Sequence, residues 1–194
     1  MKYIYSEQQM QTNLRKIYGN WELGYVLDKH TVKSIPTGRN EFGHMQFDTT
    51  RTEVGEALYQ LKNRHDWNQI EPLSHVLHTS VFPYFKDIGL IVPVLASKIR
   101  AKQPVYELAA SLAKRANIAS FNEIVEKAAN EQGLPQLKDL ETKDEKAAAL
   151  AGLFSINDQI KGEGKWNVLV VDDLYHTGAS LEAVCAALAT YIVR

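Results

Sequence analysis

The residues best suited to chemistry are two neighbouring aspartates, Asp172 and Asp173, which directly follow the aliphatic run Val168–Val171. Four consecutive aliphatic residues predict a strand that is covered on both faces, because such a strand need not alternate with polar residues. The short segment Thr177–Ser180 comes next and leads into a stretch with helical spacing. Ligands of open α/β sheets bind beyond the carboxyl ends of the strands. The sequence therefore predicts two carboxylates and a loop at a ligand-binding edge.

The loop has the composition of a phosphate site. Gly178 and Ala179 let a ligand approach the backbone closely, and the loop amides with the following helix N-terminus favour an anion. Thr177 and Ser180 add hydroxyl donors. Carboxylates beside an anion site are explained if they bind ribose hydroxyls or a Mg²⁺ ion that neutralises a diphosphate. A structural interpretation, in which the aspartates only cap the helix, is less favoured because strand, acid pair, Thr-Gly pair and helix occur together.

The rest of the chain predicts the elements that position this segment. Strands are predicted at Ile88–Val94, at Leu153–Ile156 and at Asn167–Val171. Helices are predicted from a capping box at Thr50–Glu53 to His65, from Pro72, from Pro104, at Lys143–Gly152 and at Gly178–Tyr191. Less regular segments predict a strand at Gly24–Ile35 with a turn at Pro36–Gly38, and a short strand within Asn122–Gln136 before a turn at Gly133–Pro135.

Strands and helices alternate from Ile88 onward, which predicts an α/β fold with an open, mostly parallel twisted sheet flanked by helices. We expect residues 1–49 to form a small strand-and-helix extension that packs on a core domain of residues 50–194. The chain has 194 residues, of which 45% are hydrophobic and 23% charged, as is usual for a globular protein with a real core.

Charge and cysteine content exclude several classes of protein. The net charge of −1 leaves no large basic field for indiscriminate binding of nucleic acid or membranes. The single cysteine excludes an internal disulfide framework and a multi-cysteine zinc site. The sequence has no long apolar run and no apolar leader at its start, so we expect a cytoplasmic protein without membrane association.

The segment Val170–Ser180, with the sequence VVDDLYHTGAS, resembles the signature for phosphoribosyl diphosphate (PRPP) of type I phosphoribosyltransferases. The upstream segments Leu58–Arg64, Ile91–Lys98, Gln136–Leu140 and Gly152–Ile156 resemble successive parts of the ComF-like branch of that family. The resemblance covers the chain from about Thr50 to its end. It implies the type I phosphoribosyltransferase fold, binding of PRPP with Mg²⁺, and transfer of the phosphoribosyl group to a nitrogen nucleophile with release of pyrophosphate. No acceptor can be named from the sequence.

The resemblance also implies roles for single residues. Asp172 and Asp173 would hold the ribose 2′- and 3′-hydroxyls, directly or through Mg²⁺. The 5′-phosphate would lie against the four loop residues Thr177, Gly178, Ala179 and Ser180. The pyrophosphate would face Ser97 and Lys98, with Arg100 and Lys102 closing over it as a mobile basic loop. A solvated loop explains Arg100 and Lys102 equally well, since a run of charge is a weak signal.

Several positions depart from the family pattern. His176 stands where many members have threonine, and it is either a general base or contact to a reacting group, or a solvent-facing loop residue. The Cys-rich zinc ribbon is missing, and Ala101–Pro104 replaces the usual glycine-arginine pair. The sequence stops about four helical turns after Gly178, before the strand with which relatives usually continue. We therefore expect the acceptor pocket to be incomplete or to be supplied by the N-terminal region.

These departures keep two alternatives open beside the transferase. One is a non-catalytic regulatory module that binds PRPP or a nucleotide. The other is a ComF-like partner in DNA uptake or repair, which the near-zero net charge does not favour. A homodimer is compatible with either function.

Overall fold

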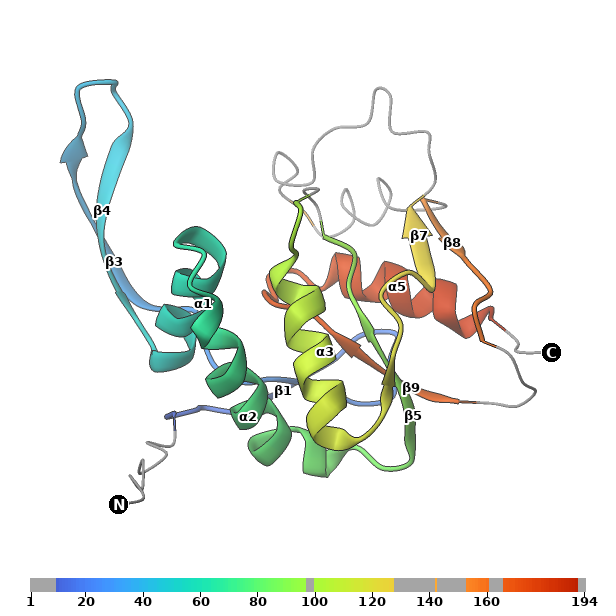
Figure 1. Cartoon of the computed structure of the whole chain (residues 1–194). Coiled ribbons are helices and arrows are strands. Elements are labelled where there is room, and N and C mark those ends of the chain that lie inside the picture. The colour runs from blue at the N-terminus through green and yellow to red at the C-terminus, as the bar shows by residue number, and fades with distance from the viewer. Residues whose placement is uncertain (1–9, 97–99, 128–141, 143–152, 161–165, 192–194) are drawn as a thin grey trace, which may run out of the picture.

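A computed structural model describes residues 10–96, 100–127, 142, 153–160 and 166–191 of the chain (Figure 1). The first half contains β1 (Arg15–Ile17), β2 (Gly24–Val26), β3 (Thr31–Arg39), β4 (Met45–Arg51), α1 (Glu53–Asn63), η1 (Trp67–Gln69), α2 (Ile70–Ser80) and η2 (Phe82–Tyr84). The second half contains β5 (Ile88–Pro93), α3 (Pro104–Ala116), β6 (Ala119–Ser120), β7 (Val125–Lys127), β8 (Phe154–Ile156), β9 (Asn167–Val171) and α5 (Ala179–Ala189).

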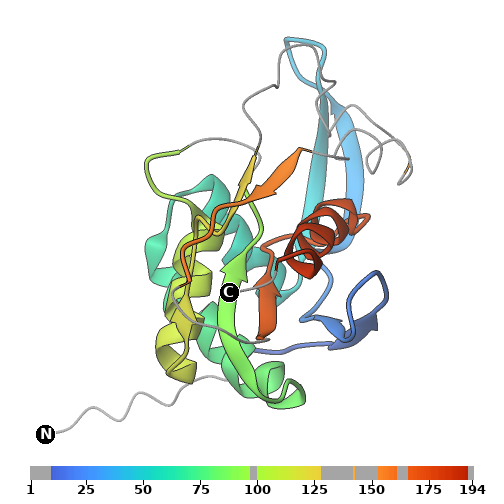
Figure 2. The ribbon, with the colours of Figure 1, turned by 90° about the vertical axis from the view of Figure 1, so that its right-hand side faces the viewer.

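A parallel sheet of three strands, in the order β6-β5-β9, forms the centre of the described structure. Figure 2 shows β5 and β9 side by side, with Val92 opposite Val170 in the register. Successive residues of a strand point to opposite faces. Ile91 and Val171 accordingly pack against α3, whereas Leu90 and Val168 pack with residues of α5. Both faces are covered, which explains why these strands are continuously apolar.

The remaining described strands form three antiparallel pairs, β1–β2, β3–β4 and β7–β8. The fold is thus mixed α/β, with one parallel sheet flanked by helices and several small sheets. The β3–β4 hairpin projects from the body of the molecule in both views (Figures 1 and 2). The β1–β2 pair instead lies beside the core.

The strands predicted from Ile88, Leu153 and Asn167 are confirmed as β5, β8 and β9, and the predictions from Pro104 and Gly178 are confirmed as α3 and α5. The short strand predicted within Asn122–Gln136 is β7. The helix predicted at Lys143–Gly152 and the turn at Gly133–Pro135 lie outside the described residues. Within the part of the chain that the structure describes, no helix has both the length and the apolar character needed to cross a bilayer.

The predicted start of α1 was wrong by two residues. Thr50 belongs to β4, and Thr52 is the N-cap, since its Oγ1 accepts a hydrogen bond of 2.9 Å from the Gly55 amide. Glu53 does not close a capping box on Thr50, because its carboxylate accepts the Gln11 amide at 2.7 Å. A tertiary contact has replaced the local one.

The predicted strand at Gly24–Ile35 and its turn were also wrong. Two strands occupy this stretch, and residues 36–38 continue β3 through a register shift at Pro36/Gly38, where Gly38 has a φ of 116°. The chain reverses at Asn40–Gly43 instead. There the Asn40 side chain accepts the amides of Phe42 and His44 at 3.1 and 2.9 Å. A β-bulge absorbed the proline and glycine that signalled a turn.

Candidate functional site

Asp172 and Asp173 emerge where β9 ends, beside the end of β5. The Val94 amide donates to the Val171 carbonyl at 2.8 Å, which fixes the last register position before the acid pair. Asp172 then turns back locally, because its Oδ1 accepts the Asp173 amide at 2.8 Å. The two predicted carboxylates are therefore brought together at the carboxyl edge of the parallel sheet, as expected of an α/β ligand site.

The two carboxylates have different environments. Burial and, to a smaller extent, the neighbouring charge of Asp173 raise the pKa of Asp172 to about 6, against opposing effects of the Asp173 and Leu174 amides and of Lys62. A carboxyl group of this kind titrates close to neutral pH. Divergent environments within one acid pair are typical of functional sites, although structural networks produce them as well.

Lys62 is part of this site and was not among the predicted functional residues. Its Nζ lies 3.0 Å from Asp173 Oδ1, and the two side chains are only 27% and 15% exposed. The residues are 111 positions apart. The only sequence signal was that Lys62 lies in the segment Leu58–Arg64, which resembles the ComF-like branch. The ammonium ion partly neutralises the acid pair from the last turn of α1.

The two described basic side chains of the loop before α3, Arg100 and Lys102, lie at different places. The Arg100 guanidinium donates to the Lys62 carbonyl at 3.4 Å, which places it beside the residue that pairs with Asp173. The Lys102 ammonium lies 3.5 Å from Glu107 and 4.3 Å from the centre of the Trp67 ring, so its charge is engaged near the start of α3. Ser97 and Lys98 lie outside the described residues.

The loop before α5 contains a position, residue 178, whose backbone conformation favours glycine. Gly178 is the N-cap of α5 and has a φ of 80°, a left-handed conformation that favours glycine. A Cβ at this position would also lie 3.0 Å from the Tyr175 ring. Gly178 and Ala179 are buried, Thr177 and Ser180 are half-buried, and His176 is exposed. The loop thus ends at a helix N-terminus, where the first amides lack partners within the helix, and such an end suits an anion.

Within the described residues, no group of three or more His, Cys, Asp or Glu side chains could hold a metal ion. Mg²⁺ is commonly bound by one or two carboxylates, with substrate phosphates and water completing the shell. Asp172 and Asp173 supply such carboxylates, although one Asp173 oxygen already faces Lys62. This donor set fits a Mg²⁺ ion that arrives with a diphosphate better than a resident ion.

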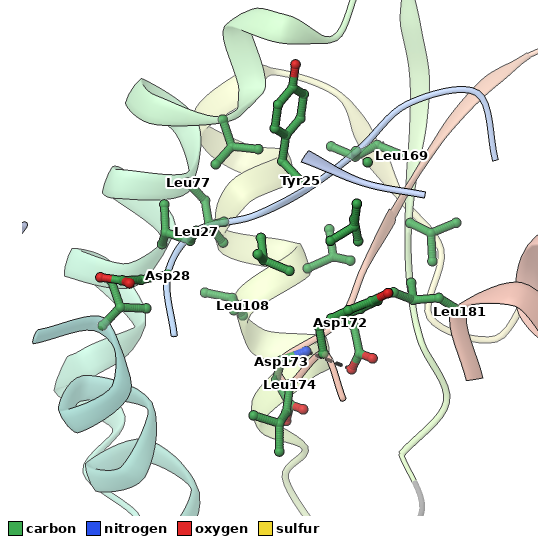
Figure 3. Close-up of a pocket in the computed structure, with 18 of the residues that line it drawn as sticks. Tyr25, Leu27, Asp28, Leu77, Leu108, Leu169, Asp172, Asp173, Leu174 and Leu181 are labelled. Atoms are coloured by element: carbon green, nitrogen blue, oxygen red, sulfur yellow. Dashed lines mark hydrogen bonds between the residues drawn. The ribbon is translucent and has the colours of Figure 1, made fainter. Parts of the chain in front are cut away.

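A cavity of about 410 Å³ adjoins the acid pair. Figure 3 shows Asp172 and Asp173 at one end of it and Tyr25 toward the other. Its walls come from residues between Trp21 and His30, from α1, α2 and α3, from Val168–Val171 of β9, and from α5. This volume lies within the range of small-molecule sites.

Comparison of the chain with known proteins finds no matching family model, no similar curated protein and no similar solved structure. The geometry of the acid pair, the loop and the cavity is therefore the basis for a functional argument.

Proposed function

We propose that this chain is a phosphoribosyltransferase-like protein that binds PRPP with Mg²⁺ and transfers the phosphoribosyl group to a nitrogen nucleophile, releasing pyrophosphate. One observation carries the proposal: an acid pair at the carboxyl end of a half-buried parallel strand is followed by a left-handed glycine and a helix N-terminus. The sheet β6-β5-β9 would be three strands of the open, twisted sheet of type I phosphoribosyltransferases.

The two halves of the site match the two polar parts of a ribose phosphate. Asp172 and Asp173 offer acceptors for vicinal hydroxyls, and the amides of Gly178 and Ala179 with the hydroxyls of Thr177 and Ser180 offer donors for the 5′-phosphate. The loop residues 174–177 separate these halves along the chain. A single bound molecule with hydroxyls next to a phosphate ester would use both halves at once.

The transfer requires positioning and charge stabilisation from the protein. The lone pair of the acceptor nitrogen forms a bond to C1′ of the ribose, and the bond from C1′ to the pyrophosphate oxygen breaks with its electron pair on that oxygen. An acceptor nitrogen that carries a hydrogen then releases that proton to solvent, whereas a pyridine-type nitrogen keeps the positive charge of the new N-ribosyl bond. Mg²⁺, when bound at Asp172 and Asp173, would offset charge on the diphosphate. Lys62 pairs with Asp173, and Arg100 donates to the Lys62 carbonyl, so these two cations of the described part of the chain would stabilise the departing pyrophosphate.

Thermal melting with ligand tests this proposal, because a ligand that binds only the folded state raises the melting temperature by mass action. We expect PRPP with Mg²⁺ to raise the Tm of the wild-type chain but not that of Asp173→Asn. Asp48→Asn is the matched control, since it makes the same change of charge on the exposed β4 strand. An unchanged Tm of the wild type in millimolar PRPP would contradict the proposal.

A second candidate is a regulatory module that binds PRPP without turnover. The Lys62–Asp173 pair favours it, because the ammonium ion competes with Mg²⁺ for one carboxylate. PRPP binding without pyrophosphate release, measured over a panel of ammonia, amines and ring nitrogen compounds, would select this candidate over the transferase.

A further inference from the structure

The cavity beside the acid pair has a fixed wall on its N-terminal side. We call residues 21–30 the roof segment. The turn before it is tied to α5, since Asn20 Nδ2 donates to the Glu182 carbonyl at 2.7 Å. The Tyr25 ring packs at a tilt of 35° on Tyr84 of η2, with centroids 4.9 Å apart. At its other end, Thr52 Oγ1 donates to the Lys29 carbonyl at 2.6 Å. The roof segment is therefore attached to three elements and is a built wall of the cavity.

The glycine at position 55 allows the roof segment to pack closely against α1. A Cβ at Gly55 would overlap the backbone carbonyl of His30, so the roof segment crosses α1 where the helix has no side chain. The crossing brings His30 toward Lys62. The pKa of His30 is lowered by burial, then by the charge of Arg51, and then by the charge of Lys62. The roof segment thus lies on the helix that carries the cation paired with Asp173.

The interior walls of the cavity are apolar. They consist of leucine side chains from three helices together with aromatic rings: Leu58, Leu77, Leu108, Leu112, Phe82 and Phe85. The charged and histidine side chains that line the cavity come from β1, from the roof segment and from the acid pair: Arg15, Asp28, Lys29, His30, Asp172 and Asp173. A ligand rich in polar groups would leave many of them without partners against the leucine walls, which is costly.

The backbone of β9 adds polar groups along one side. Val171 turns its carbonyl toward β5, and backbone direction alternates along a strand, so the peptide groups of Val168 and Val170 point away from β5. Among the described strands, none pairs with β9 on that side. Both valines line the cavity. An edge of this kind can bond to the in-plane nitrogen atoms of a flat ring.

We propose that this cavity binds the acceptor, and that the acceptor is a planar, largely apolar nitrogen heteroaromatic compound of two or three fused rings. The role of the bound compound as acceptor rests on the proposed function. The size follows from the volume, since a cavity of ~150 Å³ holds one benzene ring and this one is about 410 Å³. The ring body would lie against the leucines, and its nucleophilic nitrogen would face the end of the cavity at Asp172 and Asp173.

Calorimetric titration with benzimidazole, indole and quinoline tests the proposal, with cytosine and uracil as polar comparators. We expect at least one fused ring compound to bind ten times more tightly than either pyrimidine. Leu77→Trp places an indole in the cavity and should weaken that binding at least tenfold. Val32→Trp is the matched control, because it adds the same ring at a position that is 64% exposed on the projecting hairpin, and its affinity should equal that of the wild type.

A labelling measurement on the wild type covers the case in which Leu77→Trp does not fold. Cys185 is the only cysteine of the chain and lines the cavity, so a bound ring should slow its reaction with methyl methanethiosulfonate.

The proposal is overturned if no fused ring binds at millimolar concentration, if the pyrimidines bind equally well, or if Leu77→Trp binds as the wild type does. The Tm shift with PRPP and Mg²⁺ is recorded on the same protein. Its absence would refute the proposed function, whereas the ring titrations alone decide whether the cavity takes this class of compound.

Discussion

Replacement of Asp172 by asparagine should stabilise the protein at neutral pH while removing its ligand response. The pKa of Asp172 is raised from 3.8 to about 6 by burial and by Asp173. At ~1.36 kcal/mol per pKa unit, the ionised carboxylate lowers the free energy of unfolding by up to about 3 kcal/mol above pH 6. Asparagine removes that charge and keeps an oxygen for the Asp173 amide. We expect a net gain of about 1–3 kcal/mol at pH 7, since relaxation around the site reduces the full value.

The gain has a defined pH window. An acid whose folded pKa is raised binds more protons in the folded state between the unfolded pKa of 3.8 and about 6, so wild-type stability falls as pH rises through this range. Below pH 3.8 both proteins carry a neutral side chain and should be equally stable. Above pH 6 the difference should reach a plateau.

Thermal melts of both proteins from pH 3.5 to 8 measure this difference. At ~2–4 °C per kcal/mol for a chain of this size, Asp172→Asn should raise the Tm by about 2–12 °C at pH 7 and leave it unchanged at pH 3.5. The reasoning about the acid pair would be refuted by a difference that does not vary with pH, or by a loss of stability at pH 7. Addition of PRPP with Mg²⁺ should raise the Tm of the wild type alone.

Three further predictions concern the same region. Leu77→Phe should change the free energy of unfolding by less than about 1 kcal/mol because Leu77 faces the cavity. Leu61→Phe in the same core cluster should instead cost about 1–3 kcal/mol by overpacking. Equal losses of the two variants in denaturant titrations would argue against the cavity. Lys62→Met should cost about 1–2 kcal/mol because it leaves Asp173 unpaired and mostly buried, and Lys62→Arg should restore most of the loss; a neutral Lys62→Met would show that the pair contributes nothing. Burial, with a smaller effect of Glu182, raises the pKa of Cys185 to about 11, so iodoacetamide at pH 8 should react at least tenfold more slowly with the folded than with the urea-unfolded chain; equal rates would contradict the burial.

The sequence predicted well those parts of the site whose determinants are local. β9, the acid pair, a short loop and the start of α5 follow each other within about twenty residues, and each is specified by residues within a few positions. The apolar face of α3 was likewise readable from its helical spacing, since Val105, Leu108 and Leu112 are all buried. Local patterns of this kind survive folding because tertiary contacts reinforce them.

The missed features depend on contacts between distant residues. Lys62 meets Asp173 only because α1 packs beside the end of the sheet, and a lysine near the end of a helix has an ordinary local explanation in the helix dipole. The roof segment was predicted as part of one long strand, because nothing in its sequence shows that it crosses α1 at Gly55. The cap of α1 moved because Glu53 bonds to Gln11. The cavity is lined by residues of the roof segment, α1 and β9, which lie far apart in the sequence, so it could not be predicted from the chain alone.

Equilibrium titration of the wild-type chain with PRPP is the most direct test of the central claim, that the acid pair and the α5 loop bind one ribose phosphate. We expect saturable binding of one PRPP per chain in the presence of Mg²⁺, weakened at least tenfold both in Asp173→Asn and in Gly178→Val, which act on opposite halves of the site. Absence of binding by the wild type, or binding that both variants leave unchanged, would contradict the claim.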